Sequence, residues 1–111
     1  LSEVLKSMLK NSNRDALGYR KQISSSDVEG DYQFIKYGQL HEMCKNFSNN
    51  IVLNKLYEES SFEDEKGLWN IVGIFSRNCL EWVVTDIGLQ MNDITSVTFY
   101  STLGSESFDH I

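Results

Sequence analysis

The most constraining feature of this 111-residue sequence is a strand–helix–strand pattern over residues 68–104. Residues 68–75 form a nearly continuous apolar run, which is typical of a strand covered on both faces in a parallel sheet. Residues 94–100 have a second strand-like composition. The apolar residues between the two strands follow helical spacing at Leu80, Val83, Val84, Ile87 and Met91. The pattern predicts an α/β fold containing a βαβ unit with a right-handed crossover.

Three further elements are predicted upstream of this unit. Residues 1–14 carry an apolar cluster on one side of a short helical lead-in. Residues 16–37 alternate like a β-hairpin with a long polar loop around Gly30. Residues 38–57 form the clearest helix, because its apolar residues recur at helical spacing at Leu40, Met43, Cys44, Phe47 and Ile51.

Two further segments are not assigned to the hairpin, the helices or the βαβ unit. Residues 58–67 are acidic and without periodicity, so we interpret them as a solvated loop rather than an acidic binding element. Residues 105–111 resemble the first turns of another helix. Since the chain starts at Leu1 rather than Met and stops within that predicted helix, we expect the sequence to be a piece of a longer protein.

Composition and charge exclude several classes of protein. Hydrophobic residues make up 41% of the chain, which fits one globular module and not a disordered acidic tail. No apolar run approaches the roughly 20 residues that a membrane-spanning helix needs. The formal net charge of −6 argues against binding to nucleic-acid backbones.

Neither the cysteines nor the histidines form a recognisable reactive site. Cys44 and Cys79 lie in apolar periodic stretches without metal-ligand spacing, so we expect two buried free thiols that pack, in a reducing compartment. Cys79 begins a predicted helix, but no histidine lies nearby to activate it. His41 is predicted on the polar face of its helix, and His110 lies far from it in the sequence. We therefore predict no metal site.

The turn after the first strand of the βαβ unit is the natural place for a bound phosphate. It lacks the glycines that such a loop needs, since none occurs between Gly73 and Gly88. We predict instead that Ser76 or Asn78 caps the helix, with Asn78 and Glu81 three residues later as a capping box. Trp82 is expected in the core or at an interface rather than stacked on a base or cofactor.

No catalytic, cofactor-binding or metal residue is predicted for the chain as a whole. Open α/β sheets bind ligands at the carboxyl ends of their strands, so the positions just after Phe75 and Phe99 are the nearest to a cleft. That rule alone assigns no site.

Several blocks of sequence resemble the amino-terminal region of long-chain acyl-CoA synthetases, members of the adenylate-forming superfamily. The most specific are VGIFSRNCLEW at 72–82, YSTLGSE at 100–106, and His110-Ile111 after them. Upstream, ALGYR at 16–20 and FIKYGQL at 34–40 resemble the family's hairpin and the start of the helix that follows it. The resemblance covers about residues 14–111 in order.

The chain also departs from the family pattern. Lys36 stands where the family usually has the threonine of a capping box, which removes a side-chain acceptor and about 1 kcal/mol of helix stabilisation. Leu80 and Thr98 replace prolines, in keeping with a sequence that contains no proline. The acidic loop at 58–67 is longer than in many relatives.

The resemblance implies a fragment of a ligase that activates a long-chain fatty acid with ATP and Mg²⁺ and transfers the acyl group to CoA. It carries over no catalytic residue, because the family's phosphate loop, adenine motif, ribose-binding Asp and carboxy-terminal Lys do not occur in this sequence. We therefore expect the fragment alone to be inactive and to bind none of these cofactors.

The same resemblance implies partners and a location. The expected partners are the rest of the polypeptide and, for the parent enzyme, the fatty acid, ATP and CoA. The expected location is the cytoplasm or the cytoplasmic face of an internal membrane such as the endoplasmic reticulum, with any membrane attachment of the parent encoded elsewhere. The alternative is a stand-alone α/β interaction module without catalytic activity, whose exposed strand edges favour self-association.

Overall fold

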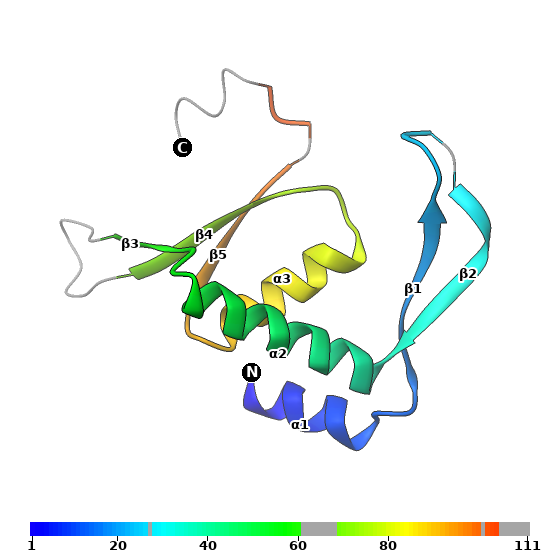
Figure 1. The fold of residues 1–111 in the computed structure, drawn as a ribbon, viewed down its shortest axis with the longest axis horizontal. Helices are drawn as coiled ribbons and strands as arrows, with labels where there is room; N and C mark the ends of the chain where they lie inside the picture. Colours follow the sequence, from blue (N-terminus) through cyan, green and yellow to red (C-terminus); the bar gives the residue numbers. More distant parts are fainter. Residues whose placement is uncertain (27, 61–68, 101, 105–111) are drawn as a thin grey trace.

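The computed structural model describes residues 1–26, 28–60, 69–100 and 102–104. Within them the chain is a mixed α/β structure with three helices and two small sheets (Figure 1). The elements in chain order are α1 (Ser2–Lys10), β1 (Asp15–Gln22), β2 (Val28–Lys36), α2 (Tyr37–Leu53), β3 (Glu58–Ser60), β4 (Trp69–Phe75), α3 (Leu80–Gln90) and β5 (Thr95–Phe99). The predicted α/β class is confirmed at this level, and the predicted helix start at residues 105–111 lies outside the described residues.

The predicted hairpin is present as the antiparallel pair β1–β2, which extends away from the helices (Figure 1). The prediction was wrong about Gly30, which lies inside β2 rather than in the loop. Gly30 has a φ of +62°, and the register shifts between Tyr19 and Lys21. A glycine in this left-handed conformation lets a strand absorb extra residues as a bulge instead of ending there.

The predicted lead-in helix is α1, and it packs on the body of the protein. Met8 is buried against α2, and Leu5 packs beside it. Val4 and Leu9 remain exposed, so only part of the predicted apolar cluster contacts the core.

Helix α2 was predicted to run to residue 57 but ends at Leu53. Lys55 adopts a left-handed φ of 49°, and the Leu56 N–H donates to the Ile51 carbonyl at 3.0 Å. The Lys55 N–H donates to the Val52 carbonyl at 3.1 Å. These two bonds form a Schellman motif, which ends a helix without a glycine at the left-handed position and so escaped the sequence pattern.

The start of α2 has half of a capping box. The Lys36 backbone N–H donates to Gln39 Oε1 at 2.9 Å. The reciprocal bond needs an acceptor on residue 36, and a lysine ammonium offers none. The structure therefore agrees with the expectation that residue 36 provides no side-chain acceptor for the first turn of α2.

The βαβ unit is confirmed, with β4 and β5 paired in parallel and α3 between them in sequence. Ile71 pairs with Thr95 and Phe75 with Phe99. The Ser96 hydroxyl donates to Asp86 Oδ1 at 2.6 Å, which ties β5 to α3.

The acidic stretch was predicted to be entirely loop, and this is wrong for its first three residues. β3 pairs antiparallel with the start of β4, from Glu58 opposite Ile71 to Ser60 opposite Trp69. Short, charged edge strands carry no hydrophobic alternation, so sequence periodicity does not reveal them. Residues 61–67 lie outside the described part of the chain.

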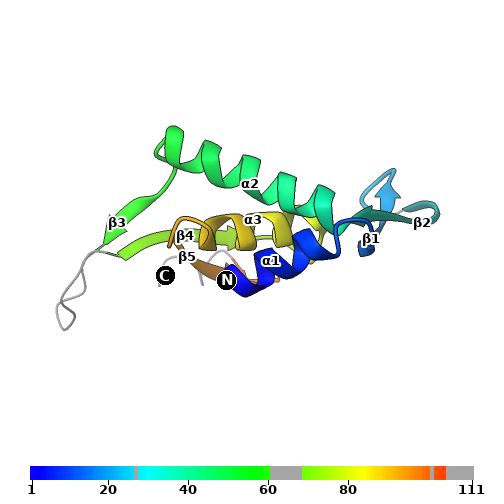
Figure 2. The same ribbon diagram turned by 90° about the horizontal axis from the view of Figure 1, so that it is seen from below.

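The core consists of two clusters joined by α2 and α3. The cluster beside the hairpin contains Met8, Ile35, Leu40, Cys44 and Val84. The cluster on the sheet contains Ile51, Ile74, Leu89 and Ile94. Figures 1 and 2 show α3 packed between α2 and the β4–β5 pair. α1 contacts α2, so the three helices lie to one side of that pair.

The two helices approach closely at Gly88. A Cβ at this position would lie 2.6 Å from the Phe47 ring and 3.0 Å from the Cys44 carbonyl oxygen. Asn92, just beyond α3, donates to the Ser48 carbonyl at 2.9 Å and to the Ser48 hydroxyl. These contacts fix the carboxyl-terminal end of α3 against the middle of α2.

The prediction that β4 is covered on both faces is wrong for the described residues. Ile74 points toward α3 and is 6% exposed, whereas Trp69 and Phe75 on the opposite face are 42% and 51% exposed. The helices pack on one face only, and the apolar run exceeds what that packing buries. No helix in the described part of the chain is long and apolar enough to cross a membrane.

Candidate functional site

The loop from β4 into α3 is the position where the sequence analysis considered a bound phosphate and predicted a helix cap instead. Cys79 is the N-cap of α3, with extended backbone at φ −155°, and no side chain hydrogen-bonds the first turn. The prediction that Ser76 or Asn78 caps the helix is therefore wrong. The Ser76 hydroxyl donates to the Arg77 carbonyl at 2.9 Å rather than accepting from a backbone N–H of the first helical turn.

The same serine orients the Cys79 thiol. Ser76 Oγ lies 3.7 Å from Cys79 Sγ. A hydroxyl has one proton to donate, and Ser76 gives it to Arg77, so the thiol is the donor in this second contact. Cys79 is half-buried in this arrangement, which differs from the fully buried thiol that the sequence predicts.

Cys44 does match its predicted packing role. Its side chain is fully buried at the contact of α2 with α3 and is not in a disulfide. Burial raises the pKa of the Cys44 thiol from 9.0 to about 11, and a backbone hydrogen bond lowers it in part. A thiol with a raised pKa is a poor nucleophile at neutral pH.

His41 lies less exposed than predicted. It is half-buried, and its Nδ1 is buried without a hydrogen-bond partner. α2 contacts α1, α3 and both strands of the hairpin, so the buried part of its surface is wider than the apolar stripe alone suggests. His110 lies outside the described residues.

Trp82 has the core role that was predicted for it. It is half-buried and packs against the cluster of Ile51, Ile74, Leu89 and Ile94. In the described part of the chain, no group of three or more His, Cys, Asp or Glu side chains could hold a metal ion.

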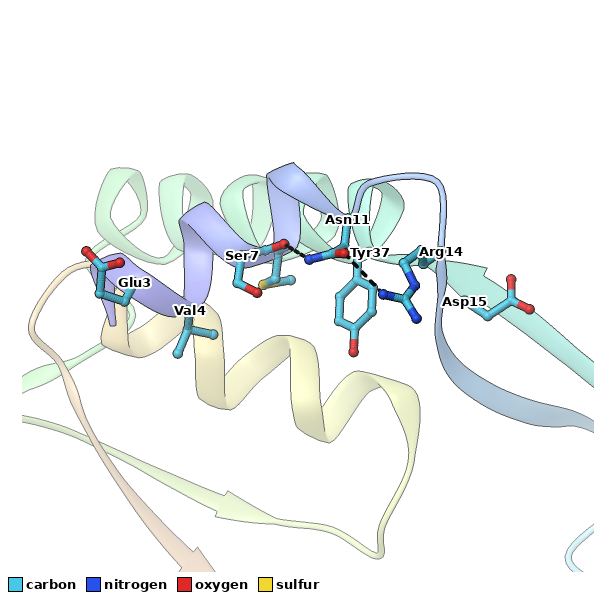
Figure 3. Close-up of a pocket in the computed structure, with 8 residues that line it drawn as sticks. Glu3, Val4, Ser7, Asn11, Arg14, Asp15 and Tyr37 are labelled. Atoms are coloured by element: carbon cyan, nitrogen blue, oxygen red, sulfur yellow. Dashed lines mark hydrogen bonds between the residues drawn. The ribbon is translucent and has the colours of Figure 1, made fainter.

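A pocket of about 600 Å³ lies between α1 and the base of the hairpin (Figure 3). The Asn11 amide donates to the Ser7 carbonyl at 2.8 Å, and Arg14 donates to Asn11 Oδ1 at 3.4 Å. No sequence pattern indicates this pocket, because it forms only when the hairpin returns beside α1. Its lining residues are Glu3, Val4, Ser7, Met8, Asn11, Arg14, Asp15 and Tyr37.

The chemistry of this pocket is not specific. Glu3, Arg14 and Asp15 are exposed and carry charges of both signs. Exposed charges of mixed sign are well solvated and select neither an anion nor a cation. The pocket therefore defines no reaction, and neither the pocket nor the loop at Ser76 forms a catalytic centre.

Comparison with known proteins supplies the information that the described side chains do not. Fatty acyl-CoA synthetase B of Dictyostelium discoideum is 30% identical over 108 residues, which cover 97% of this chain and 14% of that protein. Fatty acyl-CoA synthetase A of the same organism is 29% identical over 102 residues, covering 92% of this chain and 14% of that protein. Long-chain-fatty-acid–CoA ligase 5 of Rattus norvegicus is 28% identical over 99 residues, covering 89% of this chain and 12% of that protein.

The similarity thus extends over nearly the whole chain, while the chain spans only about one eighth of the length of these relatives. No protein-family model matches the chain, and no solved structure matches it. At about 30% identity over about 100 residues, the similarity supports a segment of a fatty acyl-CoA synthetase.

Proposed function

We propose that these residues form the amino-terminal structural segment of a long-chain fatty acid–CoA ligase. The observation that supports the proposal is the similarity over 86–97% of this chain to relatives named as fatty acyl-CoA synthetases or long-chain-fatty-acid–CoA ligases. The βαβ unit is compatible with a small part of a larger α/β domain.

The reaction proposed for the whole enzyme has two steps. A fatty acid carboxylate is a poor electrophile, so the enzyme first joins it to AMP from ATP and releases pyrophosphate. The thiol of CoA then displaces AMP and forms acyl-CoA. Mg²⁺ and basic groups supply stabilisation for the charge that develops on the phosphates.

We propose that the described residues take no direct part in this chemistry. The loop after β4 lacks the glycines that cradle phosphate, and no described cluster of side chains suits a metal ion. We propose that the segment builds part of a larger sheet and supports the acyl and nucleotide sites from behind. The activity would take place in the cytoplasm or on the cytoplasmic face of an internal membrane such as the endoplasmic reticulum.

Fatty-acid-dependent ATP–pyrophosphate exchange tests both halves of the proposal. The full-length polypeptide that contains these residues should catalyse the exchange with a long-chain fatty acid, and the 111-residue chain should not. Exchange above background by the 111-residue chain would contradict the structural role. Absence of exchange by the folded full-length polypeptide, with any fatty acid from short to long, would contradict the ligase.

A stand-alone interaction module is the second candidate, and the exposed apolar face of the β4–β5 pair favours it. The coding sequence after residue 111 separates the two candidates. A glycine-rich Ser/Thr loop ending in Lys within the next few hundred residues, a distance set by typical domain size, supports the ligase. A stop codon shortly after residue 111 supports the module.

A further inference from the structure

The face of the β4–β5 pair opposite α3 is apolar and carries exposed large side chains, among them Trp69 and Phe75. Strand alternation and the parallel register place its members together: Trp69, Ile71, Gly73, Phe75, Thr95, Val97 and Phe99, here called the apolar sheet face. Trp69 is 42% exposed and Val97 is 36% exposed. The Phe99 ring lies across Gly73, where a Cβ would approach it to 2.9 Å.

Parallel strands are almost always covered on both faces, because their crossover connections place elements there. Here α3 covers one face, and no described helix lies on the other (Figures 1 and 2). An apolar sheet face of this composition is typical of an interface with another element.

The topology limits what can cover this face. The sheet order is β3-β4-β5. Among the described strands, β3 pairs with one edge of β4, and the outer edge of β5 is the one to which a further parallel strand can be added. A strand that continues the sheet beyond β5 would be reached by a crossover of the same hand as the one from β4 to β5. Two crossovers of the same hand in the same direction place their helices on the same face, which is the face that α3 already covers.

We infer that the apolar sheet face is the docking surface for an apolar helix from a segment of the same polypeptide that lies beyond the crossover following β5. This inference rests on the proposed function, which makes these residues part of a longer ligase chain. The relatives support an occupant in the same polypeptide, because this chain spans only 12–14% of their length. A helix that directly follows β5 and leads to a strand beyond β5 is excluded by the direction of the crossover.

Site-specific labelling in the full-length polypeptide tests the covering of this face. Val97→Cys places a thiol on the apolar sheet face, and Lys45→Cys places a matched thiol on the exposed side of α2. Maleimide modification is localised to individual cysteines by fragment-ion mass spectrometry, so labelling at Cys44 and Cys79 is distinguished from labelling at the introduced thiols. We expect the thiol at position 97 to react at least about tenfold more slowly than the thiol at position 45 in the native protein, and equally fast after unfolding.

A photoreactive phenylalanine analogue at position 69 identifies the occupant. We expect an intramolecular cross-link to a peptide more than about 30 residues beyond residue 111, past the length of one crossover unit. A cross-link to the residues of the next crossover, a cross-linked species of twice the mass, or equal native labelling rates at positions 97 and 45 would each overturn the inference.

The activity of the same preparation separates this inference from the proposed function. Fatty-acid-dependent ATP–pyrophosphate exchange together with rapid labelling at position 97 would overturn the docking surface and leave the ligase standing. Slow labelling at position 97 without any exchange would overturn the ligase and leave a covered sheet face in a protein of another function.

Discussion

The two faces of the β4–β5 pair are both apolar in sequence but differ sharply in packing. On the face toward α3, Leu89 and Ile94 close over Ile74, and all three are at most 6% exposed. On the other face, Phe75 remains 51% exposed. One continuous apolar run in β4 therefore supplies two apolar faces, and the described residues cover one of them. The proposed docking of a further helix would account for the apolar character of the other.

Truncation of one apolar side chain on each side of the β4–β5 pair gives the largest expected contrast in stability. Leu89→Ala should lower the free energy of unfolding by about 3 kcal/mol, since a fully buried leucine leaves a cavity when truncated. Val97→Ala on the apolar sheet face should change the stability of the 111-residue chain by less than about 0.5 kcal/mol. Urea denaturation followed by circular dichroism measures both values. Equal losses would show that the two faces are packed alike.

The buried thiol on the helix side gives a pH-dependent contrast. The pKa of Cys44 is raised from 9.0 to about 11, so the folded protein retains a proton that the unfolded chain releases. The contribution of this group is fully present below pH 9.0 and is lost as the pH rises through about 11. Relative to Cys44→Ala, the native chain should lose about 2 kcal/mol over that interval. Parallel pH profiles for the two proteins would contradict the burial of this thiol.

Two glycines provide the next comparison. Gly88 lies at the contact of α3 with α2, and Gly73 lies on the apolar sheet face. Gly88→Ala should lower stability by about 1.5 kcal/mol, because the new methyl meets the Cys44 carbonyl oxygen, and backbone cannot easily move. Gly73→Ala meets only the Phe99 ring on the apolar sheet face, which can rotate away, so its cost should be smaller. Thermal unfolding of both variants measures the difference. A larger loss for Gly73→Ala would mean that the apolar sheet face is already tightly packed.

The smallest expected effect is a stabilisation at the end of α2, away from both faces. Lys55 has a left-handed backbone, so Lys55→Gly should raise the free energy of unfolding by about 0.5 kcal/mol. Asn54→Gly is the control, since its φ of −95° gives glycine no such advantage. A destabilised Lys55→Gly variant would contradict the Schellman geometry at this helix end.

The elements that sequence reasoning predicted correctly are those with strong periodicity. The spacing of Leu40, Cys44 and Ile51 gives the buried stripe of α2, and the apolar run ending at Phe75 gives β4. These patterns survive because burial of one face dominates the choice of secondary structure.

The errors occur where a local backbone geometry or a tertiary contact decides the outcome. Lys55 ends α2 in a conformation that glycine usually adopts, and Gly30 bulges a strand that it was expected to end. Cys79 rather than Asn78 occupies the N-cap of α3, and the Ser76 hydroxyl donates to the Arg77 carbonyl instead of capping the helix.

The functional assignment depended on the resemblance rather than on side-chain chemistry. No constellation of reactive groups was predicted, and the pocket beside Arg14 arises only when α1 and the hairpin come together. In the proposed structural role the segment needs no reactive groups of its own, so its residues indicate packing surfaces rather than a reaction.

Completion of the sheet by the rest of the polypeptide is tested most directly by hydrogen–deuterium exchange in β4 and β5. The backbone amides of these strands should exchange at least about tenfold more slowly in the full-length polypeptide than in the 111-residue chain, because covering the apolar sheet face raises the free energy of local opening. Equal exchange rates in the two proteins would contradict a covering element and leave the face exposed in the full-length polypeptide.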